Sequence, residues 1–295
     1  MDNTIFDIMN QSQPTQQQTS PIFILIDGSY FNFYRYFSLM NWWKNAHPTE
    51  PLDNPIQNEI FVDKFKKTFV ESLKEMSNKL KIPKEYTPIM IVGKDCKREN
   101  IWRTELCKNH ELFQGEYKGG RKNTSENGFM GGPLFQLAYE KEFFRQGGVK
   151  AVLKHPRLEA DDCIAISTKY ILNKWPLAQI KIVTSDKDYL QLVNQNVELY
   201  DLSYKRLTDQ KTCTGDPKCD LFCKIIMGDP SDNIKSVLNK CGPKTALKCF
   251  NNREYFEERL KKENAYALYE LNKTLVDFNE IPQQYVDEFI ESIKR

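Results

Sequence analysis

Residues 21–27 read Pro-Ile-Phe-Ile-Leu-Ile-Asp and are followed by Gly28. Every position between Pro21 and Asp27 is apolar, and three of them are β-branched isoleucines, which is typical of a strand buried on both faces of a parallel sheet. Asp27 then falls at the carboxyl end of that strand. The run therefore predicts a buried strand that ends in a carboxylate.

The same pattern occurs twice more along the chain. Residues 87–92 form an apolar run that ends just before Asp95, and residues 180–184 form another that ends before Asp186 and Asp188. Helical patterns separate the strands. One amphipathic helix is expected over residues 61–80, and another begins near Glu159. This alternation predicts an α/β fold with a mostly parallel central sheet flanked by helices, in which ligands bind beyond the carboxyl ends of the strands.

Three regions are expected along the chain. Residues 1–20 are polar, with five glutamines between positions 11 and 18, and are predicted to form a disordered tail. Residues 21–200 hold the α/β pattern. Residues 201–295 are more charged and helical, with helical candidates at 221–227, 244–250 and 255–275, so we expect a smaller helical part there.

Composition limits the class of protein. The chain has 295 residues, with 42 Lys and Arg against 40 Asp and Glu, a net charge of +2 that indicates no polyanionic partner by itself. No apolar run approaches the ~20 residues of a membrane span. Neither a secretory signal nor a transit peptide is visible, so an intracellular protein without a membrane partner is expected. Among eight cysteines, zinc binding by Cys213, Cys219, Cys223 and Cys241 is an alternative to plain thiols, but the spacing fits no zinc motif.

Acidic residues follow the apolar segments in four clusters. These candidate metal ligands are Asp27, Asp95, Glu159, Asp161, Asp162, Asp186, Asp188, Asp229 and Asp232. Carboxylates gathered at one edge repel each other unless a cation is present, and oxygen ligands without histidine favour Mg²⁺ or Mn²⁺ over zinc. Asp186 and Asp188 point the same way, about 6.6 Å apart at ~3.3 Å per residue, and can bind one ion or bridge two. Taken singly, each acid could instead cap a helix or a turn.

A basic segment and a helix start complete the candidate site. Residues 117–122 read Tyr-Lys-Gly-Gly-Arg-Lys, which joins an aromatic face that can stack on an unpaired base to cations that can neutralise a phosphate. Further on, Gly242 and Pro243 favour a helix N-terminus, which can hold a backbone phosphate. The alternative for the basic segment is a solvated charged face, and the alternative for Gly242 and Pro243 is an ordinary helix start.

Six motifs in order resemble the flap endonuclease and 5′-to-3′ exonuclease family, particularly its bacterial and phage branch. They are Ile-Leu-Ile-Asp27-Gly, Asp95 with Trp102-Arg103, Tyr117-Lys118-Gly-Gly-Arg121, Leu158-Glu159-Ala-Asp161-Asp162, Thr184-Ser-Asp186-Lys-Asp188 and Met227-Gly-Asp229-Pro-Ser-Asp232-Asn233. The resemblance implies a PIN-like nuclease core that uses two Mg²⁺ ions, with Mn²⁺ able to substitute. It also implies cutting of DNA near 5′ ends or flaps to leave a 5′-phosphate and a 3′-hydroxyl.

The resemblance also implies roles for individual residues. One ion would be held by Asp27, Asp95, Glu159 and Asp161, with Asp162 as a supporting acid. The other ion would be held by Asp186, Asp188, Asp229 and Asp232. Tyr117 would stack on a base, while Lys118 and Arg121 would act on the scissile phosphate. The remaining DNA contacts implied are Arg103, Lys122, Gly242, Lys244, Thr245 and Lys248.

Two larger features follow from the same resemblance. A segment over about 100–145 would form an arch above a single-stranded 5′ end, and a helix–turn–helix module near 237–248 would grip duplex DNA, with K⁺ in related proteins. Here Lys240-Cys241-Gly242 departs from the family's Gly-x-Gly, which leaves the K⁺ site open, and Lys94 replaces a phenylalanine before Asp95.

The leading hypothesis is a monomeric, stand-alone, structure-selective 5′ nuclease in DNA replication or repair. The alternatives are a non-catalytic scaffold that binds branched DNA and a related nuclease that cuts RNA or RNA–DNA.

Overall fold

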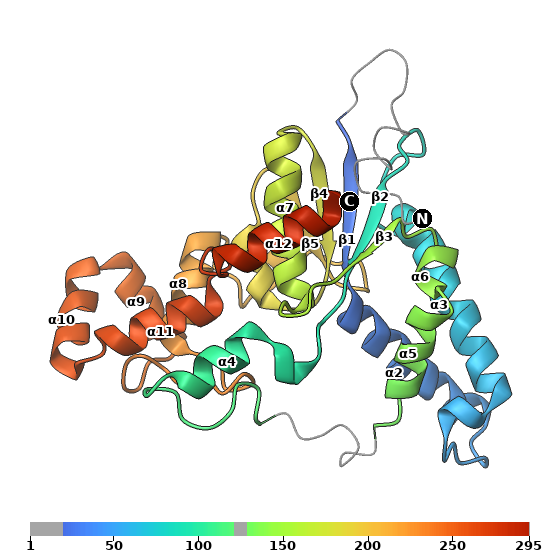
Figure 1. Ribbon diagram of the computed structural model, residues 1–295, viewed down its shortest axis with the longest axis horizontal. Helices are drawn as coiled ribbons and strands as arrows, with labels where there is room; N and C mark the ends of the chain where they lie inside the picture. The colour runs from blue at the N-terminus through green and yellow to red at the C-terminus, as the bar shows by residue number, and fades with distance from the viewer. Residues whose placement is uncertain (1–19, 121–128, 295) are drawn as a thin grey trace.

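The computed structural model describes residues 20–120 and 129–294, and its centre is a five-stranded parallel sheet (Figure 1). The strands are β1 (Ile22–Asp27), β2 (Ile89–Gly93), β3 (Ala151–Leu153), β4 (Gln179–Val183) and β5 (Val197–Tyr200). Their order is β3-β2-β1-β4-β5, so β1 lies in the middle with β2 and β4 as neighbours. Because the strands are parallel, all of their carboxyl ends meet at one edge.

The central strand is buried on both faces, as predicted. Phe23, Ile24, Leu25 and Ile26 are fully buried. Phe23 and Leu25 pack into the core on one side of the sheet, whereas Ile24 and Ile26 pack into the core on the other. This two-sided burial explains why the run is apolar throughout instead of alternating.

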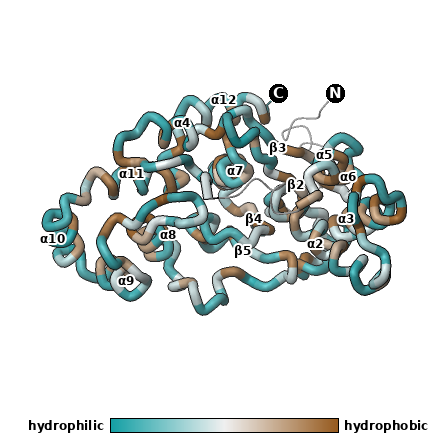
Figure 2. Tube along the Cα trace, turned by 90° about the horizontal axis from the view of Figure 1, so that it is seen from below, coloured by the Kyte–Doolittle hydropathy of each residue, from teal (hydrophilic) through white to brown (hydrophobic). Residues whose placement is uncertain are grey.

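Helices cover both faces of the sheet (Figures 1 and 2). One face carries α7 (Ala160–Lys174) and α12 (Gln283–Lys294). The other carries α2 (Gly28–Ala46), α3 (Glu59–Lys79), α5 (Gly132–Glu140) and α6 (Phe143–Gln146). The described chain therefore has a layered α/β core, and the expected fold class is confirmed.

The helix predicted over 61–80 is α3, which begins two residues earlier and ends one residue earlier. Asn58 caps it by accepting the backbone N–H of Phe61 at 2.9 Å. Its apolar stripe, Phe61, Phe65, Phe69, Leu73 and Met76, is fully buried. Side chains of this size stabilise by about 1.5–3 kcal/mol each when buried, so the stripe anchors α3 to the sheet.

The C-terminal part is helical, as expected, and has a core of its own. It contains α8 (Pro217–Met227), α9 (Pro243–Asn251), α10 (Arg253–Glu263) and α11 (Tyr266–Val276). The helical pattern over 255–275 is interrupted at Asn264, whose left-handed backbone (φ 50°) separates α10 from α11. Since α12 returns to pack beside α7, the predicted boundary at residue 200 does not separate two independent packing units.

Short elements connect these parts. They are α4 (Trp102–Asn109) and the 3₁₀ turns Pro55–Gln57, Arg98–Asn100, Lys187–Leu192 and Leu207–Asp209. The predicted tail lies almost wholly in residues 1–19, outside the described chain, and the predicted arch includes residues 121–128, which are also outside it. Within residues 20–120 and 129–294, no helix has the length and apolarity needed to cross a bilayer. The helix–turn–helix module remains a prediction, with α8 and α9 joined by residues 228–242.

Candidate active site

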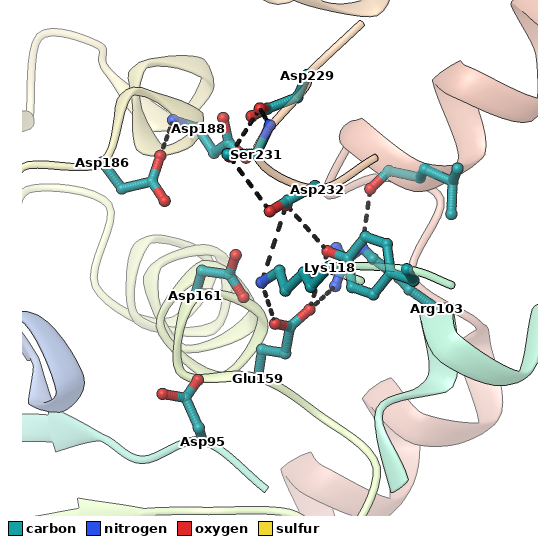
Figure 3. A network of polar contacts seen from close by, with 12 residues as sticks. Asp95, Arg103, Lys118, Glu159, Asp161, Asp186, Asp188, Asp229, Ser231 and Asp232 are labelled. Carbon is teal, nitrogen blue, oxygen red and sulfur yellow. Dashed lines mark hydrogen bonds and ion pairs between the residues drawn. The ribbon is translucent and has the colours of Figure 1, made fainter. Parts of the chain in front are cut away.

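Three strand ends deliver carboxylates to one edge of the sheet, and Figure 3 shows two of these carboxylates, Asp95 and Asp186. Asp27 ends β1 and caps α2, accepting the Tyr30 N–H at 3.0 Å. Asp95 follows β2 and accepts the Ala160 N–H at 2.7 Å. Asp186 follows β4 and accepts the Asp188 N–H at 2.9 Å. All three line a hollow of about 420 Å³ together with Glu159 and Asp161, so segments more than 150 residues apart converge there.

A first acidic group lies at the start of α7. Oxygens of Glu159, Asp161 and Asp162 come within 4.8 Å of one another. Glu159 and Asp162 form a capping box: the Glu159 side chain accepts the Asp162 N–H, and the Asp162 carboxylate accepts the Glu159 N–H at 3.2 Å. The helix start thus concentrates three acids and holds them in place.

Asp162 lies beside the first group and is surrounded by hydrogen-bond donors. It is fully buried, and its two oxygens accept the Arg103 guanidinium at 2.8 and 2.9 Å and the Trp102 indole at 3.0 Å. Both oxygens accept hydrogen bonds, so this carboxylate is oriented toward Arg103 and Trp102. Asp162 positions Glu159 through the capping box.

Arg103 also differs from its predicted contact with DNA. Only 2% of the residue is exposed, so its charge is enclosed by protein. Its Nε donates to the Leu275 carbonyl at 2.8 Å and its Nη1 to Glu159 at 3.2 Å, in addition to the pair with Asp162. Arg103 therefore connects α4 to α7 and α11 instead of facing a phosphate.

A second acidic group combines the end of β4 with the loop after α8. Oxygens of Asp188, Asp229 and Asp232 lie within 4.8 Å of one another. The Lys224 ammonium on α8 pairs with Asp188 and, at 2.9 Å, with Asp229. Lys224 was not among the predicted site residues. Its place five residues before Asp229, as the one charged residue in the apolar run 221–227, is the signal that could have identified it.

Burial and like charges perturb the carboxyl groups of both sets. Burial, followed by the charge of Asp95, raises the pKa of Asp27 to about 7. Burial and the charge of Asp186 raise the pKa of Asp188 to about 6, against the opposing effect of Lys224. Burial and the neighbouring Asp162 raise the pKa of Asp161. These acids resist being ionised at the same time, because their negative charges repel one another. A bound divalent cation would offset that repulsion.

Two acids are instead held ionised by lysines. Burial alone would raise the pKa of Glu159, but Lys118 and Arg103 outweigh it and lower the pKa. Burial opposes ionisation of Asp229 as well, yet Lys224 and the Ser231 hydrogen bonds lower its pKa to about 2. The ligand atoms on offer are carboxylate oxygens, and this donor chemistry fits a hard cation such as Mg²⁺.

Tyr117 and Lys118 each contact both acidic groups, and Figure 3 shows Lys118 between them. The Lys118 ammonium pairs with Glu159 of the first group and lies 3.8 Å from Asp232 of the second. The Tyr117 hydroxyl is 3.3 Å from the same two carboxylates, and only 5% of the residue is exposed. A ring buried in this way cannot stack on a base, so the predicted role of Tyr117 does not fit its position. Arg121 and Lys122 lie outside the described residues.

Phe33 is an exposed aromatic residue that the sequence reasoning missed. It lies on α2, six residues after Asp27, lines the same hollow as Asp27 and Asp186, and is 37% exposed. Its ring stacks against Phe37, with centroids 6.3 Å apart and planes inclined by 15°. The signal in the sequence was a third aromatic residue in the first two turns of a helix capped by a candidate ligand.

The predicted duplex contacts gather at α9. Gly242 is its N-cap, and Lys244, Thr245 and Lys248 lie in its first turns. Lys244 also lines a hollow of about 820 Å³ that extends to Asp188 and Asp229. The start of α9 is therefore continuous with the second acidic group.

The cysteines do not form the alternative zinc site. Cys219 and Cys223 approach to 4.0 Å between sulfur atoms, one turn apart on α8. Across the described ranges, the groups of three or more closely spaced ligand side chains consist of acids alone. The described cysteines are free thiols.

Similarity to known proteins agrees with this geometry. The chain is 30% identical to DNA polymerase I of Lactococcus lactis subsp. cremoris over 234 residues, which are 76% of this chain and 23% of that protein. It is 30% identical to a 5′-3′ exonuclease of Buchnera aphidicola subsp. Schizaphis graminum over 247 residues, 81% of this chain and 74% of that one. The chain thus spans about a quarter of the polymerase relative.

A solved structure shares the fold. The T5 5′-exonuclease with bound zinc ions superimposes with a TM-score of 0.61 at 18% identity, over 92% of this chain and 98% of that one. Residues 22–216 match the family described as 5′-3′ exonuclease, N-terminal resolvase-like domain. The chain belongs to the flap endonuclease and 5′-3′ exonuclease family.

Proposed function

We propose that this protein is a structure-selective 5′ nuclease that hydrolyses DNA phosphodiesters at 5′ ends and flaps, leaving a 5′-phosphate and a 3′-hydroxyl. One observation carries the proposal: two acidic groups meet at one sheet edge, and the Lys118 ammonium lies between them. A DNA-binding surface without chemistry gains nothing from so many carboxylates facing phosphate. Family membership supports the same conclusion, and we place the activity in DNA replication or repair.

The carboxylates divide into two candidate ligand sets. One divalent ion would be held by Asp27, Asp95, Glu159 and Asp161. The other would be held by Asp186, Asp188, Asp229 and Asp232. The raised pKa values of Asp27 and Asp188 support this division, because each set contains one carboxyl group whose pKa is raised. Bound Mg²⁺, or Mn²⁺ in its place, would supply an activated water and neutralise charge on the phosphate. The T5 5′-exonuclease binds zinc ions, which makes divalent metal use the natural expectation here.

The protein's own cations would act on the scissile phosphate. Lys118 pairs with Glu159 and lies near Asp232, so its ammonium is at the point where the two ligand sets meet. An incoming phosphate oxygen would take the place of these carboxylates as its partner. The ammonium would then donate to the oxygen on which charge develops during hydrolysis. Arg121, three residues later in the sequence, would add a second positive charge.

Other residues would bind and orient the DNA. Phe33 is exposed at the acidic hollow and offers a ring for an unpaired base, the role first assigned to Tyr117. The start of α9, with Lys244, Thr245 and Lys248, would hold duplex phosphates, and K⁺ binding at the Gly242 turn is part of this proposal. The segment around 100–145 would cover the single-stranded 5′ end.

A cleavage assay tests the proposal directly. We expect purified protein to cut a 5′-labelled flap DNA in the presence of Mg²⁺ and to be inactive in EDTA. Asp186→Ala should abolish cutting while DNA binding stays measurable, and Asp63→Ala, which removes an exposed acid on α3, should leave cutting unchanged. Full activity of Asp186→Ala would overturn the assignment.

The same assay separates the alternatives. A flap RNA of identical sequence, tested in parallel, should be cut more slowly than the DNA. Faster cutting of the RNA would favour the RNA nuclease. Binding of flap DNA without cutting in either Mg²⁺ or Mn²⁺ would indicate a scaffold.

A further inference from the structure

A basic hollow lies beside the edge strand β5, away from the carboxylates of the candidate active site. It has a volume of about 670 Å³. Lys181 of β4 and Glu198 of β5 are paired in register on its floor, next to Tyr200. The end of α3 and residues 201–206 form its walls. β5 is the last strand in the order β3-β2-β1-β4-β5, and Figure 2 shows it at the margin of the sheet.

Positive charge predominates in this hollow. Five cationic and three acidic side chains line it. The cations are Lys79, Lys81, Lys181, Lys205 and Arg206, and the acids are Glu198, Asp201 and Asp209. Two of the acids are already engaged. Glu198 pairs with Lys181 at 2.6 Å and with Arg206, and Asp201 accepts the backbone N–H groups of Ser203 and Lys205 at 2.8 and 2.9 Å.

The floor of the hollow is held in a fixed arrangement. The Tyr200 hydroxyl donates to Glu198 at 3.0 Å and accepts from Lys181 at 3.4 Å and from Arg206 at 3.3 Å. Burial and the nearby charge of Arg206 lower the pKa of Lys181, because two cations are kept close together. An anion above them would relieve that repulsion.

The remaining lysines are available at the rim. Lys79, Lys81 and Lys205 are exposed, and within the described chain none of them has an ion-pair partner. Lys81 has a left-handed backbone (φ 55°) just beyond α3. Three separated lysines above a fixed cationic floor suit an extended polyanion better than one small, enclosed ion.

The hollow is joined to the acidic site through two elements. Lys181 lies on the same strand that leads to Asp186, five residues later and at most roughly 17 Å along an extended chain. The Leu202 N–H donates to the Tyr30 hydroxyl at 3.0 Å, and Tyr30 lines the hollow of Asp27 and Asp186. A strand bound at the acidic edge could therefore continue into the basic hollow.

We propose that the hollow between the end of α3 and β5 is a second phosphate-binding site, which holds the backbone of a nucleic-acid strand that extends beyond the acidic site. The proposal rests on the proposed function, since the substrate is taken to be DNA. It assigns Lys79, Lys81 and Lys205 as phosphate contacts and Lys181 and Arg206 as the fixed floor. Nucleic acid is favoured because the cations are spread over several positions beside a tyrosine, as in other strand-binding surfaces.

The test is a binding measurement in EDTA, so that it does not depend on cleavage. The triple variant Lys79→Gln/Lys81→Gln/Lys205→Gln removes the rim charges and leaves the ion-paired floor intact. Lys66→Gln/Lys67→Gln/Lys74→Gln removes the same charge from exposed positions earlier on α3. Fluorescence anisotropy with a labelled 5′-flap DNA gives Kd for each protein over a range of salt concentrations.

We expect the rim variant to bind about tenfold more weakly at low salt, and its salt slope to fall by about 2 relative to wild type, at ~0.7 per phosphate contact on a single strand. The control variant should stay within about twofold of wild type. Equal Kd values and slopes for the two triple variants would overturn the proposal even if the protein proves to be an active nuclease. Circular dichroism establishes that both variants are folded.

A competition arm distinguishes a nucleic-acid strand from a small anion. If the site holds a strand, millimolar inorganic phosphate should displace little DNA, and cleavage by the rim variant should be impaired only at low substrate concentration. Phosphate binding that the rim variant loses, with DNA affinity unchanged, would instead identify a small-anion site and reject the strand.

Discussion

The two acidic groups at the sheet edge meet their cations in opposite ways. In the first, Arg103 is 2% exposed and is held by Asp162, Glu159 and the Leu275 carbonyl. In the second, the Lys224 side chain is 21% exposed, and its ion pairs within the described chain are with Asp188 and Asp229 of its own group. The guanidinium is enclosed by the packing, whereas the ammonium keeps contact with solvent.

This difference shows how one fold separates support from chemistry. A buried planar guanidinium with several fixed acceptors orients the helix start that carries Glu159 and Asp161. Lys224 neutralises acids while keeping contact with solvent, so we expect a metal ion or phosphate to compete with it for these carboxylates. We expect the same competition at Lys118, which reaches both groups.

The largest expected effect comes from removing the fixed cation. Arg103→Met leaves Asp162 and Glu159 buried without their partner, and we expect a loss of about 3–5 kcal/mol in the free energy of unfolding. The matched change Lys224→Met should cost less than Arg103→Met, because Lys224, Asp188 and Asp229 keep more contact with solvent than Arg103 and Asp162. Urea denaturation of both variants measures the two values. Equal losses would show that the two cations do not differ in the proposed way.

Removing the shared lysine should affect rate more than stability. We expect Lys118→Ala to lower kcat by about 10²–10³-fold, the range seen when one donor to a developing negative charge is lost. KM should change by less than about threefold, because the proposed duplex contacts at α9 remain. Single-turnover kinetics on a flap DNA separate the two parameters. A loss confined to KM would mean that Lys118 only binds substrate.

Metal addition should show whether Lys224 competes with a metal ion for its carboxylates. Mg²⁺ at 10–100 times its Kd should stabilise the wild-type protein by about 1–3 kcal/mol. The gain should be larger in Lys224→Gln, because the ammonium no longer competes for Asp188 and Asp229. Lys218→Gln, which changes an exposed lysine at the start of the same helix, is the control and should match wild type. Thermal unfolding with and without Mg²⁺ measures the shift; a smaller gain in Lys224→Gln would contradict the competition.

The smallest effect is expected at the tyrosine between the groups. Tyr117→Phe removes a hydroxyl that contacts Glu159 and Asp232, and we expect a loss of about 0.5–1.5 kcal/mol in stability. Tyr117→Leu, which removes the ring, tests stacking, and its binding of single-stranded DNA should be unchanged because the ring is buried. Phe33→Ala is the useful contrast, since loss of a stacked base costs about 1–3 kcal/mol of binding. Weaker DNA binding by Tyr117→Leu than by Phe33→Ala would restore the stacking role of Tyr117.

Much of the scaffold could be predicted because its signals are local. The unbroken apolar run at 22–26 indicates burial on both faces, and the stripe from Phe61 to Met76 indicates one helix face. In a parallel sheet, acids that follow strands must share an edge, so Asp27, Asp95 and Asp186 could be grouped before any coordinates were known. These inferences need only the period of the side chains and the direction of the strands.

Local patterns were thus enough to predict the sheet, its flanking helices and the edge at which the carboxylates gather. The pairing of cations with acids became visible only in the folded chain: Arg103 is enclosed by α7 and α11, Lys224 faces the second group, and Tyr117 is buried between the two. The reason is physical. Periodicity sets the face on which a side chain lies, but burial and ion pairing depend on segments that are distant in the chain and approach only in the folded protein.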